Sequence, residues 1–122
     1  MKEVLLVGAG GFAGSAGRYL LTLAGAKWLP MNFPLGTFTA NVLGCLVIGV
    51  LIGAGVKTEW MTRDIFLLLA TGFCGGFTTF STFSAENINL ITTGHYLLAA
   101  FYFLSSVILG GLAVLLGMWL TK

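Results

Sequence analysis

The sequence predicts an all-α membrane protein with four transmembrane helices. Of its 122 residues, 57% are hydrophobic and only 8% are charged, whereas a soluble domain carries about 25% charged residues. The mean hydropathy is +0.99. The length suffices for about four spans of about 20 residues each, joined by short connections. These observations exclude a soluble globular protein.

The apolar residues fall into four segments, each long enough to span a bilayer. Three short connections separate them, and the first holds both prolines, Pro30 and Pro34. No linker, low-complexity tract or run of charge divides the chain, so we predict a single domain. A net charge of +2, spread over the connections, argues against a nucleic-acid partner. The segments span approximately residues 4–26, 35–55, 65–91 and 96–120.

The first segment contains a stretch, Val4–Ala13, that imitates a strand followed by the G-x-G-x-x-A dinucleotide fingerprint. That motif requires a βαβ unit and an acidic residue about 20 positions further on. No acidic residue lies between Glu3 and Glu59. Gly10 and Gly14 instead form a G-x-x-x-G step, which is typical of closely packed membrane helices. We therefore predict a membrane helix here and exclude nucleotide binding.

Small residues recur four apart in the second and third segments as well. Such stripes are usually packing seams, and they indicate that the helices contact protein closely. Four helices form a thin bundle whose interior is filled by side chains, so a solute pathway forms more readily between subunits. We therefore predict a homo-oligomer. The stripes comprise Gly36, Ala40 and Gly44, then Gly49 and Gly53, and finally Gly72 and Gly76.

The second segment carries an amide at membrane depth. Asn41 lies near the middle of this segment, with Thr37 one turn earlier on the same face. A buried amide must be hydrogen-bonded, and within a membrane it usually faces a partner helix or a watery cavity. Spacing alone leaves both interpretations open.

The third segment is the most unusual, because three glycines and five hydroxyl residues lie between Gly72 and Ser84. A continuous helix is weak there, since Gly-Gly lowers helix stability and hydroxyls compete for backbone hydrogen bonds. We predict a helix break around Gly75 to Thr79, with a simple kink as the alternative. A broken membrane helix exposes carbonyls that bind cations and a half-helix N-terminus that attracts anions.

Aromatic and hydroxyl side chains follow the predicted break. Phe77, Phe80 and Phe83 recur every three residues, alongside Ser81 and Ser84. Such spacing is usual for packing, but an aromatic ring is also electropositive at its edge. Ring edges, with hydroxyl and amide donors, can replace the water around an anion without a fixed positive charge. Both interpretations remain open.

Ionisable groups well inside the segments are limited to Arg18 and Glu86. They fit either vestibules or a helix-end pairing. In the fourth segment, Tyr102, Ser105 and Ser106 add hydroxyls that extend a polar route or bond the backbone.

The sequence contains no recognisable catalytic set. It has one histidine, no nucleophile–base pair and no Cys/His/Asp cluster, so we do not expect an enzyme. We interpret Cys45 and Cys74, which lie inside apolar runs, as buried small residues rather than a disulfide or metal site. The residues alone therefore indicate a small oligomeric channel or transporter with an uncharged path for an anion.

The third-segment motif is long and resembles that of a known family. The stretch Gly75–Ser84 resembles the G-G-x-T-T-F-S-T-F-S core of the Fluc (CrcB) fluoride channels. Gly36-Thr37 with Asn41 and Gly44 resembles their second-helix motif, and Gly11 to Tyr19 resembles their first. The resemblance covers nearly the whole chain, in order.

The resemblance implies a fluoride-selective passive channel in the plasma or inner membrane of a bacterium. It also implies an antiparallel, dual-topology homodimer with two pores. Fluoride enters a cell as neutral HF and is trapped as the anion at cytoplasmic pH. A passive channel lets the anion leave down its electrochemical gradient, which protects the cell from fluoride toxicity.

The resemblance also implies roles for particular residues. Phe80 and Phe83 correspond to pore-lining aromatics with ring edges toward the ion, and Asn41 corresponds to an amide donor. The carbonyls of Gly75 and Thr78 from both subunits correspond to a cage for a central structural Na⁺, which prefers oxygen ligands. The remaining matches are Ser81, Thr82, Tyr102 and Ser106 in a polar track, with Arg18 and Glu86 at vestibule positions.

Two features depart from the family pattern. Gly110 stands where some relatives carry a fourth-helix serine, so we expect the polar track to be shorter or wetter there. The end with both termini carries four basic residues against two at the other end, which is less even than dual topology requires. These are Lys2, Lys57, Arg63 and Lys122 at the first end, with Lys27 and Arg18 at the second.

Two other functions account less well for the same residues. A small multidrug-type, proton-coupled antiporter is also a four-helix dual-topology dimer, but it is expected to use a membrane carboxylate in an aromatic pocket. Glu86 lies near a span end and is poorly placed for that role. A non-transporting scaffold subunit would leave Asn41 and the hydroxyl run unexplained.

Overall fold

A computed structural model describes residues 1–28, 32–57 and 61–122. Within these ranges the chain is helical and contains no strand. Four stretches are long and apolar enough to cross a membrane, which confirms the predicted all-α, four-span architecture. The elements are α1 (Lys2–Trp28), α2 (Leu35–Lys57), α3 (Arg63–Phe66), the π-helix η1 (Leu67–Cys74), α4 (Gly75–Phe77), α5 (Phe80–Thr92) and α6 (Tyr96–Leu120).

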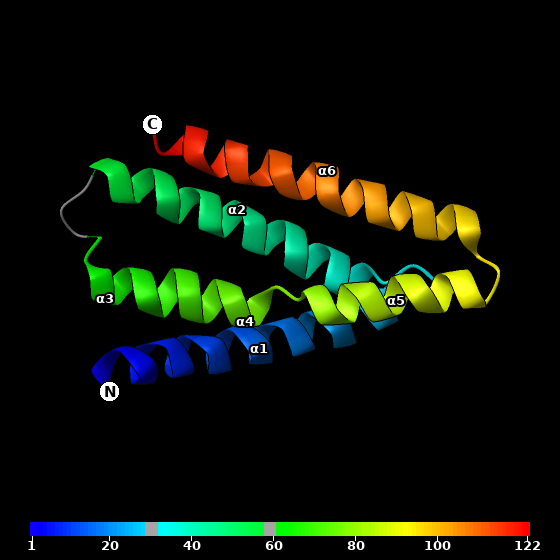
Figure 1. The fold of residues 1–122 in the computed structure, drawn as a ribbon, viewed down its shortest axis with the longest axis horizontal. Helices are drawn as coiled ribbons and strands as arrows, with labels where there is room; N and C mark the ends of the chain where they lie inside the picture. The colour runs from blue at the N-terminus through cyan, green and yellow to red at the C-terminus, as the bar shows by residue number, and fades with distance from the viewer. Residues whose placement is uncertain (29–31, 58–60) are drawn as a thin grey trace.

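The helices form an elongated bundle with both termini at the same end, as four crossings require (Figure 1). The third span consists of α3, η1, α4 and α5 in succession. Helix α2 packs along α6, while α1 packs against η1 and α4. Parts of the two connections flanking α2 lie outside the described residues, and Trp60 is among them.

Glycine seams hold these helix pairs together, which confirms their interpretation as packing stripes. A Cβ atom at Gly10 would meet the backbone of Leu68, and one at Gly14 would meet the backbone of Phe73. From the other side, a Cβ at Gly72 would lie 2.8 Å from the Val7 carbonyl oxygen. The α1 backbone therefore touches the third span directly. Residues Val4–Ala13 lie within α1, so the strand that a dinucleotide fingerprint requires before its glycines is absent from this segment.

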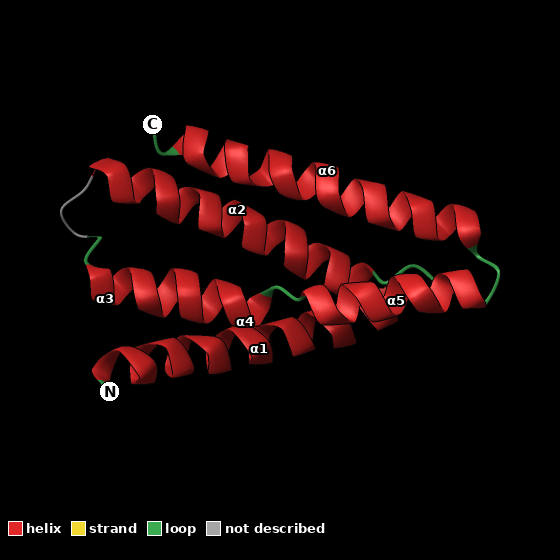
Figure 2. Ribbon diagram, in the orientation of Figure 1, coloured by secondary structure: helices red, strands yellow, loops and turns green. Residues whose placement is uncertain are grey.

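The third span is broken near its middle, as predicted (Figure 2). Thr78 has ψ 159° and Thr79 has φ −152° and ψ 125°, so both residues are extended. The predicted break began at Gly75, but Gly75–Phe77 is still helical. The break therefore falls at the hydroxyl residues, where the Thr79 hydroxyl accepts from the Thr82 N–H in place of the Thr78 carbonyl of a continuous helix.

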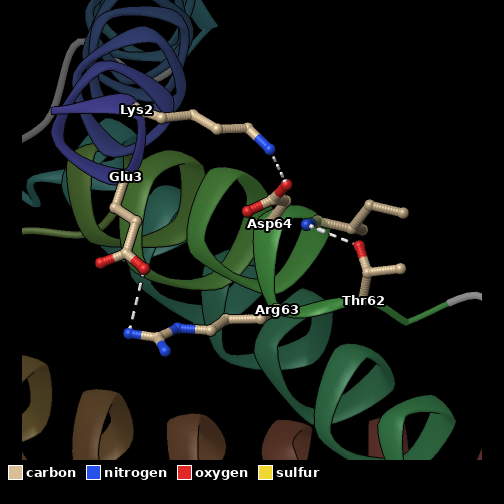
Figure 3. A network of polar contacts seen from close by, with 6 residues as sticks. Lys2, Glu3, Thr62, Arg63 and Asp64 are labelled. Atoms are coloured by element: carbon tan, nitrogen blue, oxygen red, sulfur yellow. Dashed lines mark hydrogen bonds and ion pairs between the residues drawn. The ribbon is translucent and has the colours of Figure 1, made fainter.

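The N-terminal end of the third span is attached to α1 by two ion pairs (Figure 3). Lys2 pairs with Asp64, and Arg63 lies 3.1 Å from Glu3. Thr62 caps α3 by accepting a hydrogen bond from the Ile65 backbone N–H at 3.3 Å. The paired side chains are exposed, so each pair contributes little to stability. Their effect is to fix the start of α1 beside the start of α3.

Candidate functional site

Asn41 and Thr79 bond each other reciprocally across the helix break. The Thr79 N–H donates to Asn41 Oδ1 at 2.8 Å, and Asn41 Nδ2 donates to the Thr79 carbonyl at 3.1 Å. One side chain thus satisfies both backbone polar groups of an extended residue, which would be costly to leave unpaired at membrane depth. The structure places Asn41 both on a partner segment and in the lining of a groove. The two interpretations left open by its spacing are therefore compatible.

The Thr79 hydroxyl gathers the polar side chains that follow the break. It accepts a hydrogen bond from the Thr82 N–H at 3.3 Å and so caps α5. It also lies 3.1 Å from the Thr82 hydroxyl and 3.3 Å from the Ser81 hydroxyl. Thr79 itself was not among the predicted site residues. The sequence could have pointed to it, because a threonine immediately before Phe80, where a half-helix begins, is a favoured N-cap residue.

A groove of about 470 Å³ lies between α2, the broken span and α6. Of the described residues that line it, none is charged. Ser106 Oγ is buried and has no hydrogen-bond partner among the described residues, so it keeps an unused donor. The predicted site residues that meet in this groove are Asn41, Gly75, Thr78, Phe80, Phe83 and Ser106.

The two aromatic residues of the groove differ sharply in exposure. Phe80 is 80% exposed, whereas Phe83 is only 7% exposed. Their ring centroids lie 6.2 Å apart with the planes inclined at 41°. Phe83 is fixed by an edge-on contact with the Tyr102 ring at 5.1 Å. Phe80 therefore projects from the single chain into space that its own helices leave open.

Glu86 lies in a second polar cluster rather than in the groove. The hydroxyls of Thr37 and Tyr102 each donate to one carboxylate oxygen, both at 2.8 Å. Thr37 is 2% exposed and Tyr102 is fully buried. Glu86 and Thr37 also line a cavity of about 290 Å³ at the end of the bundle away from the termini. Sequence reasoning noticed Thr37 only as a neighbour of Asn41 and did not connect it to Glu86.

A helix-end pairing was one of the two expectations for Arg18, and among the described residues it forms no ion pair. Its Nε donates instead to the Gly76 carbonyl at 3.2 Å. The Ser15 hydroxyl donates to the same carbonyl at 3.4 Å. Ser15 was missed by sequence reasoning, although it precedes Arg18 by one helical turn and so shares its face.

The two cysteines line the groove, and Gly110 packs against one of them. Cys74 is buried, Cys45 is half-buried, and both are free thiols that line the groove. A Cβ atom at Gly110 would lie 3.4 Å from Cys45 Sγ. Gly110 therefore lets the sulfur of α2 pack closely against α6.

Comparison with known proteins gives one consistent result. The family model described as "CrcB-like protein, Camphor Resistance (CrcB)" matches residues 5–118. A protein of Phocaeicola vulgatus named "Fluoride-specific ion channel FluC" is 46% identical over 122 residues, covering all of both chains. Proteins with the same name from Azobacteroides pseudotrichonymphae and Chlorobaculum tepidum are 43% and 49% identical, covering 100% and 94% of this chain and 98% and 90% of theirs.

Proposed function

The chain belongs to the CrcB-like protein family, and we propose that this multi-pass membrane protein is a fluoride-selective passive channel. Its relatives are named as fluoride-specific ion channels, a class that catalyses no covalent reaction. By the same reasoning, the channel would lie in a bacterial plasma or inner membrane and export fluoride that accumulates in the cytoplasm. Export would protect the cell, because HF enters freely while the anion cannot leave unaided.

One observation carries the proposal: the groove at the helix break is lined by hydrogen-bond donors and two phenylalanines but by no charged residue among those described. Ser106 has an unused buried donor there. The amide of Asn41 has a second N–H beyond the one given to Thr79. Helix α5 begins at Phe80, so its positive N-terminal end also faces this region. A small, strongly hydrated anion needs such donors in place of its water.

A second copy of the chain would complete the pathway. Phe80 is 80% exposed in the single chain, and it lines a groove that is only partly enclosed. We therefore propose a homodimer in which each chain supplies aromatic rings to a shared pathway, giving two pores by symmetry. We propose an antiparallel, dual-topology arrangement from the family resemblance; the excess of basic residues at one end is slight, although their distribution is less even than dual topology requires.

The backbone at the break also suits a structural Na⁺ ion. In a continuous helix, the Gly75 and Thr78 carbonyls would accept from the N–H groups four residues further on. Those N–H groups, of Thr79 and Thr82, are bonded to Asn41 Oδ1 and Thr79 Oγ1 instead. Two carbonyls from each chain of a dimer would thus be free to hold a hard cation. The ion would supply positive charge that fixes the two breaks against each other.

The remaining polar residues extend the proposed route from the groove. Ser81 and Thr82 lie beside the Thr79 hydroxyl at the start of α5. Tyr102 joins the groove to the Glu86 cluster, because its ring touches Phe83 and its hydroxyl donates to Glu86. We propose that Arg18 and Glu86 serve the mouths of the pathway.

Anion efflux from liposomes that hold the purified protein tests the function. We expect rapid fluoride release on adding an ionophore for the counter-ion, with chloride retained. Liposomes without protein are the control. Release of both anions, or of neither, contradicts a fluoride channel. A requirement for a proton gradient would instead favour the antiporter, in which a carboxylate such as Glu86 exchanges protons.

A further inference from the structure

The helix break is held from two directions by two different helices. Asn41 reaches Thr79 from α2, whereas Arg18 reaches Gly76 from α1. Arg18 uses Nε as its donor, at 3.2 Å, and the Ser15 hydroxyl adds a longer contact of 3.4 Å to the same carbonyl. Gly76 thus receives two side-chain donors from one face of α1.

The Gly76 carbonyl needs these donors because of its place in the chain. In an uninterrupted helix it would accept from the Phe80 N–H, four residues further on. Thr78 and Thr79 are extended, so Phe80 begins a new helix displaced from that ladder. A Cβ at Gly76 would collide with the backbone of Gly11, so this turn lies directly against α1. A carbonyl left unpaired in such a position is costly within a membrane.

We propose that Arg18 is a positioning residue of the permeation pathway, acting through its Nε–H bond to the Gly76 carbonyl rather than through its charge. The bond fixes the last turn before the break against α1. The position of Phe80, which starts the next helix, follows from where that turn ends. This inference rests on the proposed channel function where it is tested by fluoride efflux. Its test by hydrogen–deuterium exchange at the break does not depend on that function.

The competing role for Arg18 is that of an exposed charge that concentrates anions at a pore mouth. Three substitutions separate the two roles by atom position. In Arg18→Gln, Nε2 occupies the place of the arginine Nε, so the donor remains and the charge is lost. In Arg18→Lys, that place is taken by a methylene and the charge remains. Arg18→Met extends only as far as that place, where it has a methyl group, and removes both the donor and the charge.

The experiment measures two quantities for each variant of the full-length protein in liposomes. The first is hydrogen–deuterium exchange in peptides covering residues 75–84. The second is fluoride efflux over a range of fluoride concentrations, which separates the maximal rate from the apparent affinity. Leu20→Met, at an exposed position on the same helix, is the matched control. Ser15→Ala removes the second donor alone.

We expect Arg18→Met to speed exchange in residues 75–84 roughly tenfold, as the loss of one hydrogen bond implies. Its maximal efflux rate should fall, and high fluoride should not restore it. Arg18→Gln should retain most of the wild-type behaviour, with slower exchange and a higher maximal efflux rate than Arg18→Lys. Ser15→Ala should show a smaller change in the same direction.

The opposite ranking overturns the inference. If Arg18→Lys resembles wild type while Arg18→Gln and Arg18→Met lose efflux only at low fluoride, Arg18 acts as a charge. Should Arg18→Met fail to fold, the ranking of Arg18→Gln against Arg18→Lys decides in the same way. If the wild-type protein does not release fluoride, the channel proposal fails, and the exchange ranking alone still decides the role of Arg18.

Discussion

Among the individual residues, Thr79 has the largest share of the bonds at the break. Its N–H and carbonyl are bonded to Asn41, and its hydroxyl caps α5. The unusual character of Asn41 could be predicted from sequence, because an amide at membrane depth must have a partner. The partner could not be predicted, since it is a backbone 38 positions away that only the folded chain brings near.

The aromatic residues show the same limit. Phe80 and Phe83 have the same local spacing, and sequence patterning could not distinguish between them. In the structure one is 80% exposed and the other 7%. The difference arises because α6 covers one face of α5, where Tyr102 meets Phe83 edge-on.

Replacing Asn41 by alanine should abolish fluoride conduction. Asn41→Ala leaves the N–H and carbonyl of Thr79 without their partners, at about 1–3 kcal/mol for each unsatisfied group. It also removes an amide donor from the groove. Liposome efflux measures the loss, and size-exclusion chromatography checks that the assembly is intact. Val47→Ala, a truncation at an exposed position of the same helix, should conduct normally. Wild-type efflux in Asn41→Ala would assign the residue to packing alone.

Among the elements, the broken third span was predictable in kind because its cause is local. Gly-Gly followed by hydroxyl residues weakens a helix wherever it occurs. The break was predicted across Gly75–Thr79 and lies at Thr78–Thr79, where the Thr79 hydroxyl takes the place of the Thr78 carbonyl as acceptor for the Thr82 N–H. The π-helix Leu67–Cys74 was not predicted. Its residues are ordinary for an apolar membrane helix, so nothing local distinguishes its wider turns.

Gly14 lies in the close contact between α1 and the third span, whereas Gly8 of the same helix faces open space. A Cβ at Gly14 would lie 2.8 Å from the Phe77 N atom and still closer to the Phe73 carbonyl, whereas one at Gly8 would meet nothing within 4 Å. Gly14→Ala should destabilise the protein by about 1–3 kcal/mol through overpacking. Gly8→Ala should be neutral or stabilising by up to about 1 kcal/mol, because alanine favours a helix.

Unfolding in mixed micelles, at increasing mole fractions of a denaturing detergent, measures both glycine variants. Gly14→Ala should also reduce fluoride efflux, since the displaced turn precedes the break. Equal stability of the two variants would mean that the α1 seam relaxes without moving the third span.

At the scale of the whole molecule, the single chain leaves Phe80 exposed and a groove beside it. Its fold class could be predicted from composition and the lengths of four apolar segments, because lipid permits few alternatives. The exposed Phe80 and the groove motivate the proposed homodimer, in which a second chain would cover them. The orientation of each chain follows only weakly from charge, because four basic residues at one end face two at the other.

A prediction at this scale concerns the cation that would join two chains at their breaks. The carbonyls of Gly75 and Thr78 lose their usual donors because Thr79 and Thr82 bond elsewhere. If Na⁺ holds these carbonyls together, replacing it with a bulky organic cation should lower both fluoride efflux and the thermal stability of the assembly. Returning Na⁺ should restore both, with a midpoint that reports its dissociation constant, because an ion bound only by the folded state stabilises it by mass action. Lys122→Gln, far from the break at the chain terminus, should show the same Na⁺ dependence as wild type. Efflux and melting temperature that are unchanged without Na⁺ would refute the cage and leave the two breaks to be held by protein contacts alone.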